Sequence, residues 1–233
     1  MKDIYNDRTY LAHNPGWHAE DAPFKAGRVL ELLRRRPVPH RTIAEVGCGS
    51  GAILIELARH LPDADAFVGH DISADAIAIA RRHQHPRVRF ELGDFTATGD
   101  DGPHDLVLVI DVIEHLRDYF TFLDGIRPKG RHTIFHIPLD MCLWALLREA
   151  MLIESKERVG HIHNFTEDFI LSILADHGFE VLDKIYTPPV HKDPTARQRL
   201  VNAVRKAMFR IAPRFTTKTL GGYSIMVLAR NRA

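Results

Sequence analysis

A chain of 233 residues, 45% of them apolar, is long enough to fold around one large hydrophobic core. Its 31 basic and 30 acidic side chains nearly cancel, so overall charge gives no reason to expect a nucleic-acid-binding or membrane-binding protein. Only two cysteines occur, no apolar leader is visible, and no apolar run reaches the roughly 20 residues of a membrane span. We therefore expect a cytoplasmic protein with free thiols.

Strands and helices are predicted in alternation along most of the chain. An amphipathic helix is expected over 24–36, followed by strands at 41–46, 65–70, 87–92, 105–110 and 131–137. Helices are expected at 50–61, 74–83, 113–123 and 166–178, and the last strands at 179–186 and 223–229. Repeated strand–helix–strand units form a parallel sheet with helices on both faces, so we predict a doubly wound α/β fold.

Two segments are longer than this minimal pattern requires. Residues 139–163 lie between the fifth strand and the next helix, and residues 191–220 lie between the last two strands. Insertions at the carboxyl side of such a sheet cover the ligand crevice. We predict a single domain over 1–233, in which these two segments and residues 1–22 form helical lid insertions.

A glycine-rich turn follows the first predicted strand. Gly47, Gly49 and Gly51 alternate with other residues just before a helix, and glycine lets the backbone turn sharply and approach a ligand closely. Glu45 precedes the turn, and Asp71 ends the next strand. A carboxylate at that second strand end is placed to bind a ribose diol, so the pattern predicts a nucleoside-like cofactor.

The turn alone does not distinguish a dinucleotide cofactor from another nucleoside-like cofactor. With Ala52 in the last position it also satisfies the dinucleotide pattern G-x-G-x-x-G/A. Glu45, however, would bring negative charge toward a pyrophosphate at the helix N-terminus, whereas it suits a ligand that carries an amino group. Further acids leave the third strand at Asp94 and the fourth strand at Asp111 and Glu114.

In order and spacing, these residues resemble the class I S-adenosylmethionine-dependent methyltransferases from about residue 10 onward. The resemblance implies a Rossmann-like sheet, mostly parallel, whose last strand is antiparallel and forms an edge hairpin with the strand before it. It implies that Glu45 receives the methionine amino group, Asp71 the ribose, and Asp94 with Phe95 the adenine. The cofactor-binding residues implied in this way are Glu45, Gly47, Cys48, Gly49, Gly51, Asp71, Ile72, Asp94, Phe95 and Asp111.

The exit of the fourth strand also carries a motif, Asp111-x-x-Glu114-His115, which is followed downstream by His161 and His163. Ubiquinone-pathway O-methyltransferases and small-RNA 2′-O-methyltransferases hold a metal with a similar acid-x-x-Glu-His trio and a later histidine. That resemblance makes Asp111, Glu114, His115 and His161 candidate ligands of a divalent metal ion, although this chain has Asp where those enzymes have Glu. The alternatives are that His115, His161 and His163 act as catalytic general bases, or that they are structural.

Trp17 and His18 precede the first predicted helix. In the methyltransferase family a segment at this place often folds over the cofactor, which makes both residues candidate substrate contacts. Trp17 would then stack beside the sulfonium, since a cation over an indole face is stabilised. The alternative is that Trp17 anchors the segment to the core.

A basic amphipathic helix is predicted over 195–212. Its apolar stripe consists of Leu200, Val204, Ala207, Met208 and Ile211. We expect the stripe to be buried against the lid or the last strands, with the arginines in solvent. The alternatives are contact with a membrane surface that supplies a lipid-like acceptor, or with an anionic acceptor or RNA. Because aromatic residues are not interleaved for base stacking, we expect no nucleic-acid partner.

The sequence therefore predicts an S-adenosylmethionine-dependent methyltransferase that acts on a small organic acceptor. O-methylation is favoured over N-methylation because histidines surround the expected methyl position. The rival interpretations are a quinone or lipid O-methyltransferase at a membrane surface, a nicotinamide-dependent oxidoreductase, and a cofactor-binding module without catalytic activity.

Overall fold

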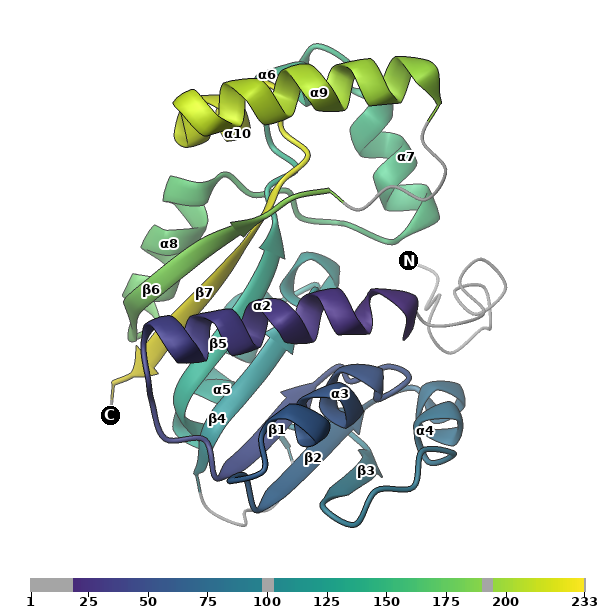
Figure 1. Cartoon of the computed structure of the whole chain (residues 1–233), viewed down its shortest axis with the longest axis vertical. Helices are drawn as coiled ribbons and strands as arrows, with labels where there is room; N and C mark the ends of the chain where they lie inside the picture. The colour runs from purple at the N-terminus through teal and green to yellow at the C-terminus, as the bar shows by residue number, and fades with distance from the viewer. Residues whose placement is uncertain (1–18, 98–102, 190–194, 233) are drawn as a thin grey trace.

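The computed structural model describes residues 19–97, 103–189 and 195–232. A seven-stranded sheet runs through the molecule, with helices on both of its faces (Figure 1). The strands are β1 (Thr42–Val46), β2 (Ala66–Asp71), β3 (Val88–Leu92), β4 (His104–Ile110), β5 (Gly130–Pro138), β6 (Phe179–Thr187) and β7 (Ser224–Asn231). The α-helices are α2 (Ala22–Arg35), α3 (Ala52–His60), α4 (Ala74–Ala80), α5 (Tyr119–Ile126), α6 (Leu143–Leu146), α7 (Ala150–Arg158), α8 (Glu167–Asp176), α9 (Ala196–Ile211) and α10 (Pro213–Thr219). Short 3₁₀ turns are η1 (Ala19–Asp21), η2 (Ile113–His115) and η3 (Arg127–Lys129).

The sheet order is β3-β2-β1-β4-β5-β7-β6. The pairs among β1 to β5 are parallel, whereas β7 runs antiparallel to both β5 and β6. This arrangement confirms the predicted doubly wound, mostly parallel sheet with an antiparallel last strand. The chain reverses its direction of winding between β1 and β4, and the crevice at such a switch point is where open α/β sheets bind ligands.

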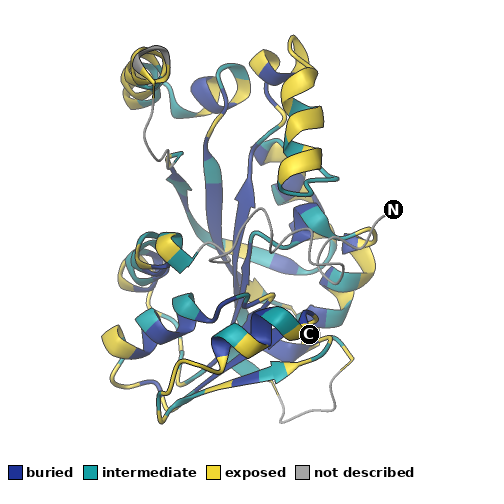
Figure 2. Ribbon diagram, turned by 90° about the vertical axis from the view of Figure 1, so that its right-hand side faces the viewer, coloured by how far each residue is buried: buried dark blue, intermediate teal, exposed yellow. Residues whose placement is uncertain are grey.

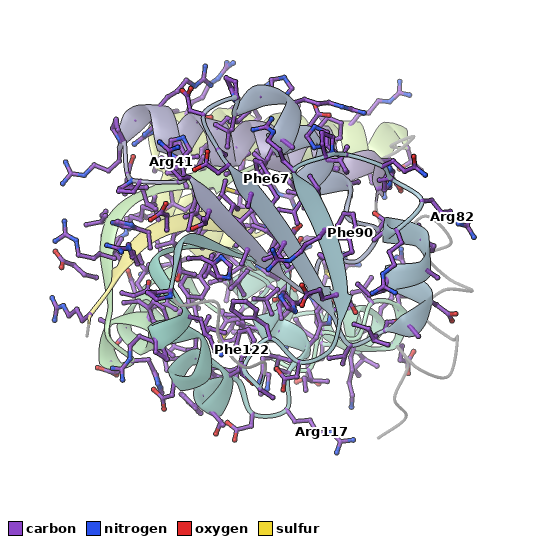
Figure 3. The ribbon with its side chains drawn as sticks, turned by 90° about the horizontal axis from the view of Figure 1, so that it is seen from below. Arg41, Phe67, Arg82, Phe90, Arg117 and Phe122 are labelled. Carbon is purple, nitrogen blue, oxygen red and sulfur yellow. The ribbon has the colours of Figure 1, made fainter. Side chains whose placement is uncertain are left out.

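Alternate residues of each strand face opposite sides of the sheet, which gives the protein two hydrophobic cores. On one side α2, α3 and α4 pack on the strands, and Leu32, Leu54 and Phe67 are fully buried there. On the other side α5 and α8 cover the sheet over Phe135 and Phe179. Figure 2 shows the strands as the buried centre of the molecule. In Figure 3 the labelled Phe67 and Phe90 lie among the strands, while Arg82 and Arg117 extend outward.

The predicted single helix over 113–123 is wrong. The chain instead makes the 3₁₀ turn η2, continues in extended conformation at Leu116, and starts α5 only at Tyr119. Asp118 caps α5 by accepting a hydrogen bond from the backbone N–H of Thr121 at 3.0 Å, and a capping aspartate favours a new helix start over a continuous helix. His115 therefore ends a short turn at the edge of the crevice.

The expected burial of the apolar stripe on α9 is also wrong. The helix forms as predicted, and a capping box between Thr195 and Gln198 starts it. Its inward side, however, carries Phe209, whose ring stacks on Tyr223 with centroids 4.2 Å apart. The aromatic pair selects the packed face of the helix, so Leu200, Val204 and Ile211 of the predicted stripe are exposed, while Met208 is half-buried.

The inserted helices α6, α7, α9 and α10 gather at one end of the molecule, beyond the carboxyl ends of the parallel strands (Figure 1). Direct packing joins α6 to both α7 and α10, and α10 to α9. Within the described ranges, no helix is long and apolar enough to cross a membrane. That these segments act as a lid stays a prediction.

Candidate active site

A cavity of about 820 Å³ lies at the carboxyl ends of β1 and β4, within the size range of small-molecule pockets. One wall is the glycine turn that follows β1, and a second is the first turn of α2. The opposite wall comes from η2 and from residues 159–162. The cavity therefore combines the expected cofactor-binding elements with the segment that carries the predicted histidines.

The glycine turn needs glycine at the positions that touch neighbouring elements. Gly47 has φ +68°, and a Cβ there would lie 2.9 Å from a methyl group of Val112. Gly51 has φ +74°, and a Cβ there would fall on the ring of Phe90. Any larger side chain would move these neighbours. The turn thus stays close to the sheet and leaves the space in front of it for a ligand.

Asp71 fastens this turn to the end of β2. One of its carboxylate oxygens accepts from the backbone N–H of Gly49 at 2.9 Å, and the other accepts from the backbone N–H of Ser73 at 2.8 Å. Burial raises the pKa of Asp71, and these hydrogen bonds oppose that effect. Each carboxylate oxygen has a second lone pair, so Asp71 can still accept hydrogen bonds from a ligand in the cavity that it lines.

Glu45 is the most unusual group of the cofactor side. Its side chain lines the cavity but is only 1% exposed, and its Oε2 atom has no hydrogen-bond partner among the described residues. Burial raises the pKa of Glu45 to about 8; the charge of Lys25 works against this and that of Asp71 adds to it. A buried carboxyl without a partner is unfavourable, so this position suits a ligand that donates hydrogen bonds and carries positive charge.

Asp111 forms the wall between the two halves of the cavity and is held from two sides. Lys25 of α2 lies 2.7 Å from one oxygen, and Nδ1 of His136 lies 2.5 Å from the other. The second nitrogen of His136 contacts the hydroxyl of Thr187 at 2.8 Å. Burial alone would raise the pKa of Asp111, but His136 and Lys25 hold it well below its ordinary value. Lys25 and His136 therefore offset the negative charge of Asp111 and fix its side chain in the wall of the cavity.

Lys25 and His136 are two cavity residues that the sequence analysis does not predict. The signal for His136 was present, because a histidine near the carboxyl end of an apolar strand lies at the ligand edge of a parallel sheet. Lys25 had no such signal, since a lysine in the first turn of an amphipathic helix is ordinary. Only the packing of α2 beside the crevice brings it to Asp111.

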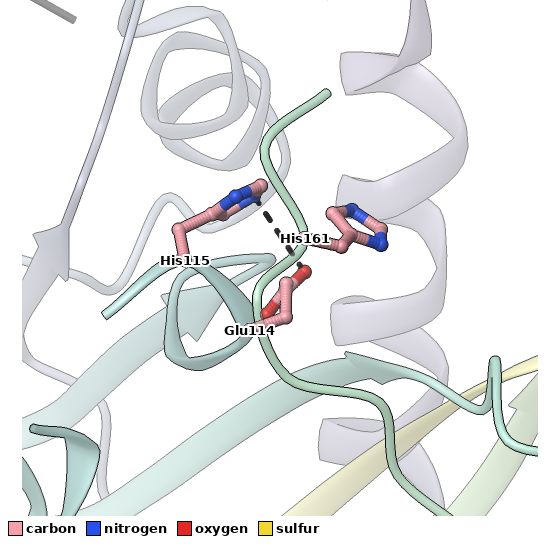
Figure 4. Close-up of side chains that lie close together, drawn as sticks. All are labelled: Glu114, His115 and His161. Atoms are coloured by element: carbon pink, nitrogen blue, oxygen red, sulfur yellow. Dashed lines mark ion pairs between the residues drawn. The ribbon is translucent and has the colours of Figure 1, made fainter. Parts of the chain in front are cut away.

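Glu114, His115 and His161 form a compact cluster in the cavity wall opposite the glycine turn (Figure 4). One donor atom from each lies within 4.8 Å of the others. Glu114 is fully buried, and neither of its carboxyl oxygens has a hydrogen-bond partner within the described part of the chain. Burial, together with the nearby charge of Asp111, raises the pKa of Glu114 well above its ordinary value, which favours the neutral acid.

The two histidines of this cluster are oriented by their Nδ1 atoms. Nδ1 of His161 lies 2.7 Å from a carboxylate oxygen of Asp140, and Nδ1 of His115 lies 3.1 Å from the carbonyl oxygen of Gly160. Both residues line the cavity. His163 does not: its Nε2 contacts the carbonyl oxygen of Leu116 at 2.8 Å. The structure thus places two of the three predicted catalytic histidines at the cavity.

The predicted metal set is brought together only in part. Glu114, His115 and His161 meet, but Asp111 is not in this cluster, and its two oxygens contact Lys25 and His136 instead. Three donors of this kind can hold a divalent ion. A neutral Glu114, however, would have to lose its proton before it could act as a ligand.

Some of the remaining predicted cofactor residues line the cavity and others do not. Cys48, Gly49 and Ile72 line the cavity, as do Gly47 and Asp71. Asp94 is exposed and accepts from the backbone N–H and the hydroxyl of Thr96, both at 2.8 Å. Phe95 is buried, with its ring 5.0 Å from that of His70. Asp94 and Phe95 do not line this cavity, and Trp17 and His18 lie outside the described residues.

Comparison with known proteins decides the family. The sequence profile of a methyltransferase-domain family matches residues 18–184. The chain belongs to this family. This membership confirms the resemblance to methyltransferases that the glycine turn and the strand-end acids predict.

Among curated members of the methyltransferase class, trans-aconitate 2-methyltransferase of Deinococcus radiodurans is 33% identical over 118 residues. The match covers 48% of this chain and 43% of that relative, so it spans less than half the length of the relative.

Solved methyltransferase structures share the fold over nearly the whole chain. The N-methyltransferase NodS from Bradyrhizobium japonicum WM9, in complex with S-adenosylhomocysteine, has a TM-score of 0.62 at 16% identity, with 100% of both chains covered. Magnesium protoporphyrin IX methyltransferase from Synechocystis PCC 6803, also with bound S-adenosylhomocysteine, has a TM-score of 0.61 at 18% identity, with 92% of this chain and 84% of that chain covered.

Proposed function

We propose that this protein is an S-adenosylmethionine-dependent methyltransferase that transfers the methyl group to an oxygen atom of a small organic acceptor. The observation that carries the proposal is the buried carboxyl of Glu45, which lines the cavity beside the glycine turn and has an oxygen without a partner. The methionine part of S-adenosylmethionine carries an ammonium group, which would supply the missing hydrogen-bond donor and the compensating charge.

The neighbouring residues support the same cofactor. Asp71 keeps lone pairs that can accept the ribose hydroxyls, and Ile72 offers an exposed apolar side chain beside it. A nicotinamide dinucleotide would place its pyrophosphate beside Glu45 and Asp71. A phosphate group offers no hydrogen-bond donor for the Oε2 of Glu45, which is unpartnered among the described residues, and it is repelled by the carboxylate of Asp71; this disfavours an oxidoreductase. The bound S-adenosylhomocysteine in NodS and in the magnesium protoporphyrin IX methyltransferase agrees with this choice.

The acceptor side supports O-methylation. Methyl transfer from a sulfonium needs alignment of donor and acceptor, and a hydroxyl acceptor also needs a base that removes its proton. His161 lines the cavity, and its Nδ1 pairs with Asp140 at 2.7 Å. In this arrangement Nε2 accepts the acceptor proton, and the carboxylate stabilises the imidazolium that forms.

The segment 139–163 would act as the acceptor-binding lid. Its residues Lys156, Val159 and Ile162 line the cavity opposite the glycine turn. Among described residues, none from α9 or α10 lines this cavity, so a lid role of the second insertion stays a prediction.

The proposal is tested by titration calorimetry with S-adenosylhomocysteine, together with a methylation assay on hydroxyl, carboxylate and amine acceptors. We expect micromolar binding by the parent protein and at least tenfold weaker binding by Glu45→Gln. Glu56→Gln, on the outer face of α3, is the control and should bind like the parent. Tight NADH binding without a response to S-adenosylhomocysteine would disprove the proposal, and turnover of amines alone would disprove O-methylation.

A further inference from the structure

The helix α9 presents two opposite faces, one packed and one unpartnered. The packed face carries Asn202, Arg205 and Phe209; Arg205 donates to the carbonyl oxygen of Leu220, and Phe209 stacks on Tyr223. An α-helix turns by about 100° per residue, so Leu200, nine positions before Phe209, lies on the opposite side. On that side Leu200 is 68% exposed, Val204 is 49% exposed and Ile211 is 87% exposed.

The neighbouring helices carry more exposed apolar side chains. We use the term apolar cap for the exposed residues of α6, α9 and α10, which are Leu143, Trp144, Leu146, Leu200, Val201, Val204, Ile211 and Phe215. The helices of the apolar cap pack on one another and lie together at the end of the molecule beyond the sheet (Figures 1 and 2). A cluster of large apolar side chains in solvent marks an interaction surface.

The two C-terminal helices of this surface, α9 and α10, are basic in sequence. From Ala196 to Thr219 the sequence holds seven arginines and lysines and no acidic residue. Arg214 and Lys218 pair with Asp168 of α8, so their charges are offset. Arg199, Lys206 and Arg210 are exposed and, at spacings of seven and four, follow one side of α9 next to the apolar stripe.

We propose that the apolar cap docks on a lipid bilayer that contains anionic lipids. An amphipathic helix with an apolar stripe and a flanking row of basic residues fits the boundary between headgroups and acyl chains. Trp144, with Arg148 placed 5.2 Å from its ring, adds an aromatic side chain of the kind that favours this boundary. A second copy of the chain fits less well, because a symmetric contact would bring the basic rows of both copies together.

Docking would also place the cavity near the bilayer. Lys156 and Val159, at the end of α7, line the cavity, and α7 packs on α6 of the apolar cap. An acceptor with an apolar tail could then pass from the bilayer to the site. This consequence rests on the proposed function, whereas the docking itself does not.

Vesicle co-sedimentation tests the docking. The full chain is mixed with vesicles of phosphatidylcholine alone or of phosphatidylcholine with 30% phosphatidylserine, over a series of salt concentrations. We expect sedimentation with the anionic vesicles, and at least a fivefold smaller bound fraction with neutral vesicles or at high salt. Absence of sedimentation with both vesicle types would overturn the proposal.

Matched variants separate the apolar cap from the rest of the surface. Leu200→Glu and Arg210→Glu should each lower the bound fraction at least threefold. Leu92→Glu, at an exposed leucine that ends β3, and Arg82→Glu, at an exposed arginine after α4, should bind like the parent. Unchanged far-ultraviolet circular dichroism and melting temperature identify the variants that are correctly folded.

If the cap variants and the control variants lost the same share of the vesicle-bound fraction, the role of the apolar cap would be refuted. A dimeric mass in light scattering without vesicles, reduced to a monomeric mass by Leu200→Glu, would overturn the proposal in favour of a second copy. Failure to bind S-adenosylhomocysteine would refute the proposed function and leave the vesicle result unaffected, so the two proposals fail separately.

Discussion

The carboxylate of Asp140 lies 2.7 Å from Nδ1 of His161, and this contact joins the two ends of the segment that lines the cavity opposite the glycine turn. Because a carboxylate can only accept, the proton of the neutral imidazole is on Nδ1 and Nε2 is left as the basic nitrogen. The same contact thus shapes the wall and, under the proposed function, orients His161 so that Nε2 can remove a proton.

Replacing His161 should affect turnover far more than cofactor binding. For His161→Gln we expect kcat to fall by about 10²-fold or more, the usual contribution of a general base, with little change in the affinity for S-adenosylhomocysteine. His163→Gln is the matched control, since His163 does not line the cavity and its ring contacts the backbone carbonyl of Leu116. Equal loss of kcat in both variants would contradict the assigned role of His161. Steady-state kinetics and calorimetry give the two readouts.

The affinity for S-adenosylhomocysteine should depend on pH through Glu45. Burial raises the pKa of this carboxyl to about 8, so it is protonated at neutral pH before the ligand binds. An ammonium ligand favours the ionised form, so affinity should rise by up to about tenfold per unit between pH 6 and pH 8. Calorimetry in buffers of different ionisation enthalpy should detect release of a proton at pH 7. Glu45→Gln should show neither effect, and a flat pH profile of the parent would contradict the assignment.

The same carboxyl should make the ligand-free protein less stable as pH rises. Its pKa is higher in the folded protein than in the unfolded chain, so the folded state binds more protons between pH 4.5 and about 8, and stability falls across that window. At pH 8 we expect Glu45→Gln to be more stable than the parent by on the order of a few kcal/mol. Thermal melts of the ligand-free proteins at pH 5 and pH 8 measure the difference. If Glu45→Gln stabilised the protein more at pH 5 than at pH 8, the pH dependence would have the opposite sign to the prediction.

Asp71 and Asp94 should differ in their effect on cofactor affinity. Asp71→Ala removes the acceptor of the Gly49 and Ser73 N–H groups and the expected ribose contact, so affinity should fall at least tenfold. Asp94→Ala should weaken binding by less, since Asp94 lies outside the cavity and bonds to Thr96. If Asp94→Ala has the larger effect, the adenine contact outweighs the ribose contact. Calorimetry with both variants makes the comparison.

Chelation tests the metal prediction. We expect activity to persist in EDTA, because Lys25 and His136 hold Asp111 away from the cluster and because burial raises the pKa of Glu114, which disfavours the ionised form that a metal needs. Dialysed protein is assayed before and after addition of Mg²⁺, Mn²⁺ or Zn²⁺. Loss of turnover in EDTA with recovery in one of these ions would show that Glu114, His115 and His161 hold a metal.

Most residues on the glycine-turn side of the cavity could be predicted from the sequence because their signals are local. Gly47 and Asp71 lie at strand ends, where position along the chain also determines position at the sheet edge. The pairing of Lys25 with Asp111 and of Asp140 with His161 depends on how distant elements pack, which a single sequence does not indicate. The packed face of α9 was predicted wrongly because the ring stacking of Phe209 on Tyr223 outweighs the count of aliphatic residues.

The position of β7 has a consequence for the order in which the protein folds. β6 comes first in the chain, yet β7 lies between β5 and β6, so β6 is joined to the sheet only through β7. The contact of Thr187 on β6 with His136 on β5 therefore requires that both the β5–β7 pair and the β6–β7 pair have formed, and we expect it to form late in folding. Contacts that form after the transition state slow unfolding without speeding folding. Thr187→Val should therefore leave the refolding rate almost unchanged and accelerate unfolding. The hydrogen bond between Thr187 and His136 would then slow the unfolding of the assembled sheet without affecting how fast the sheet forms.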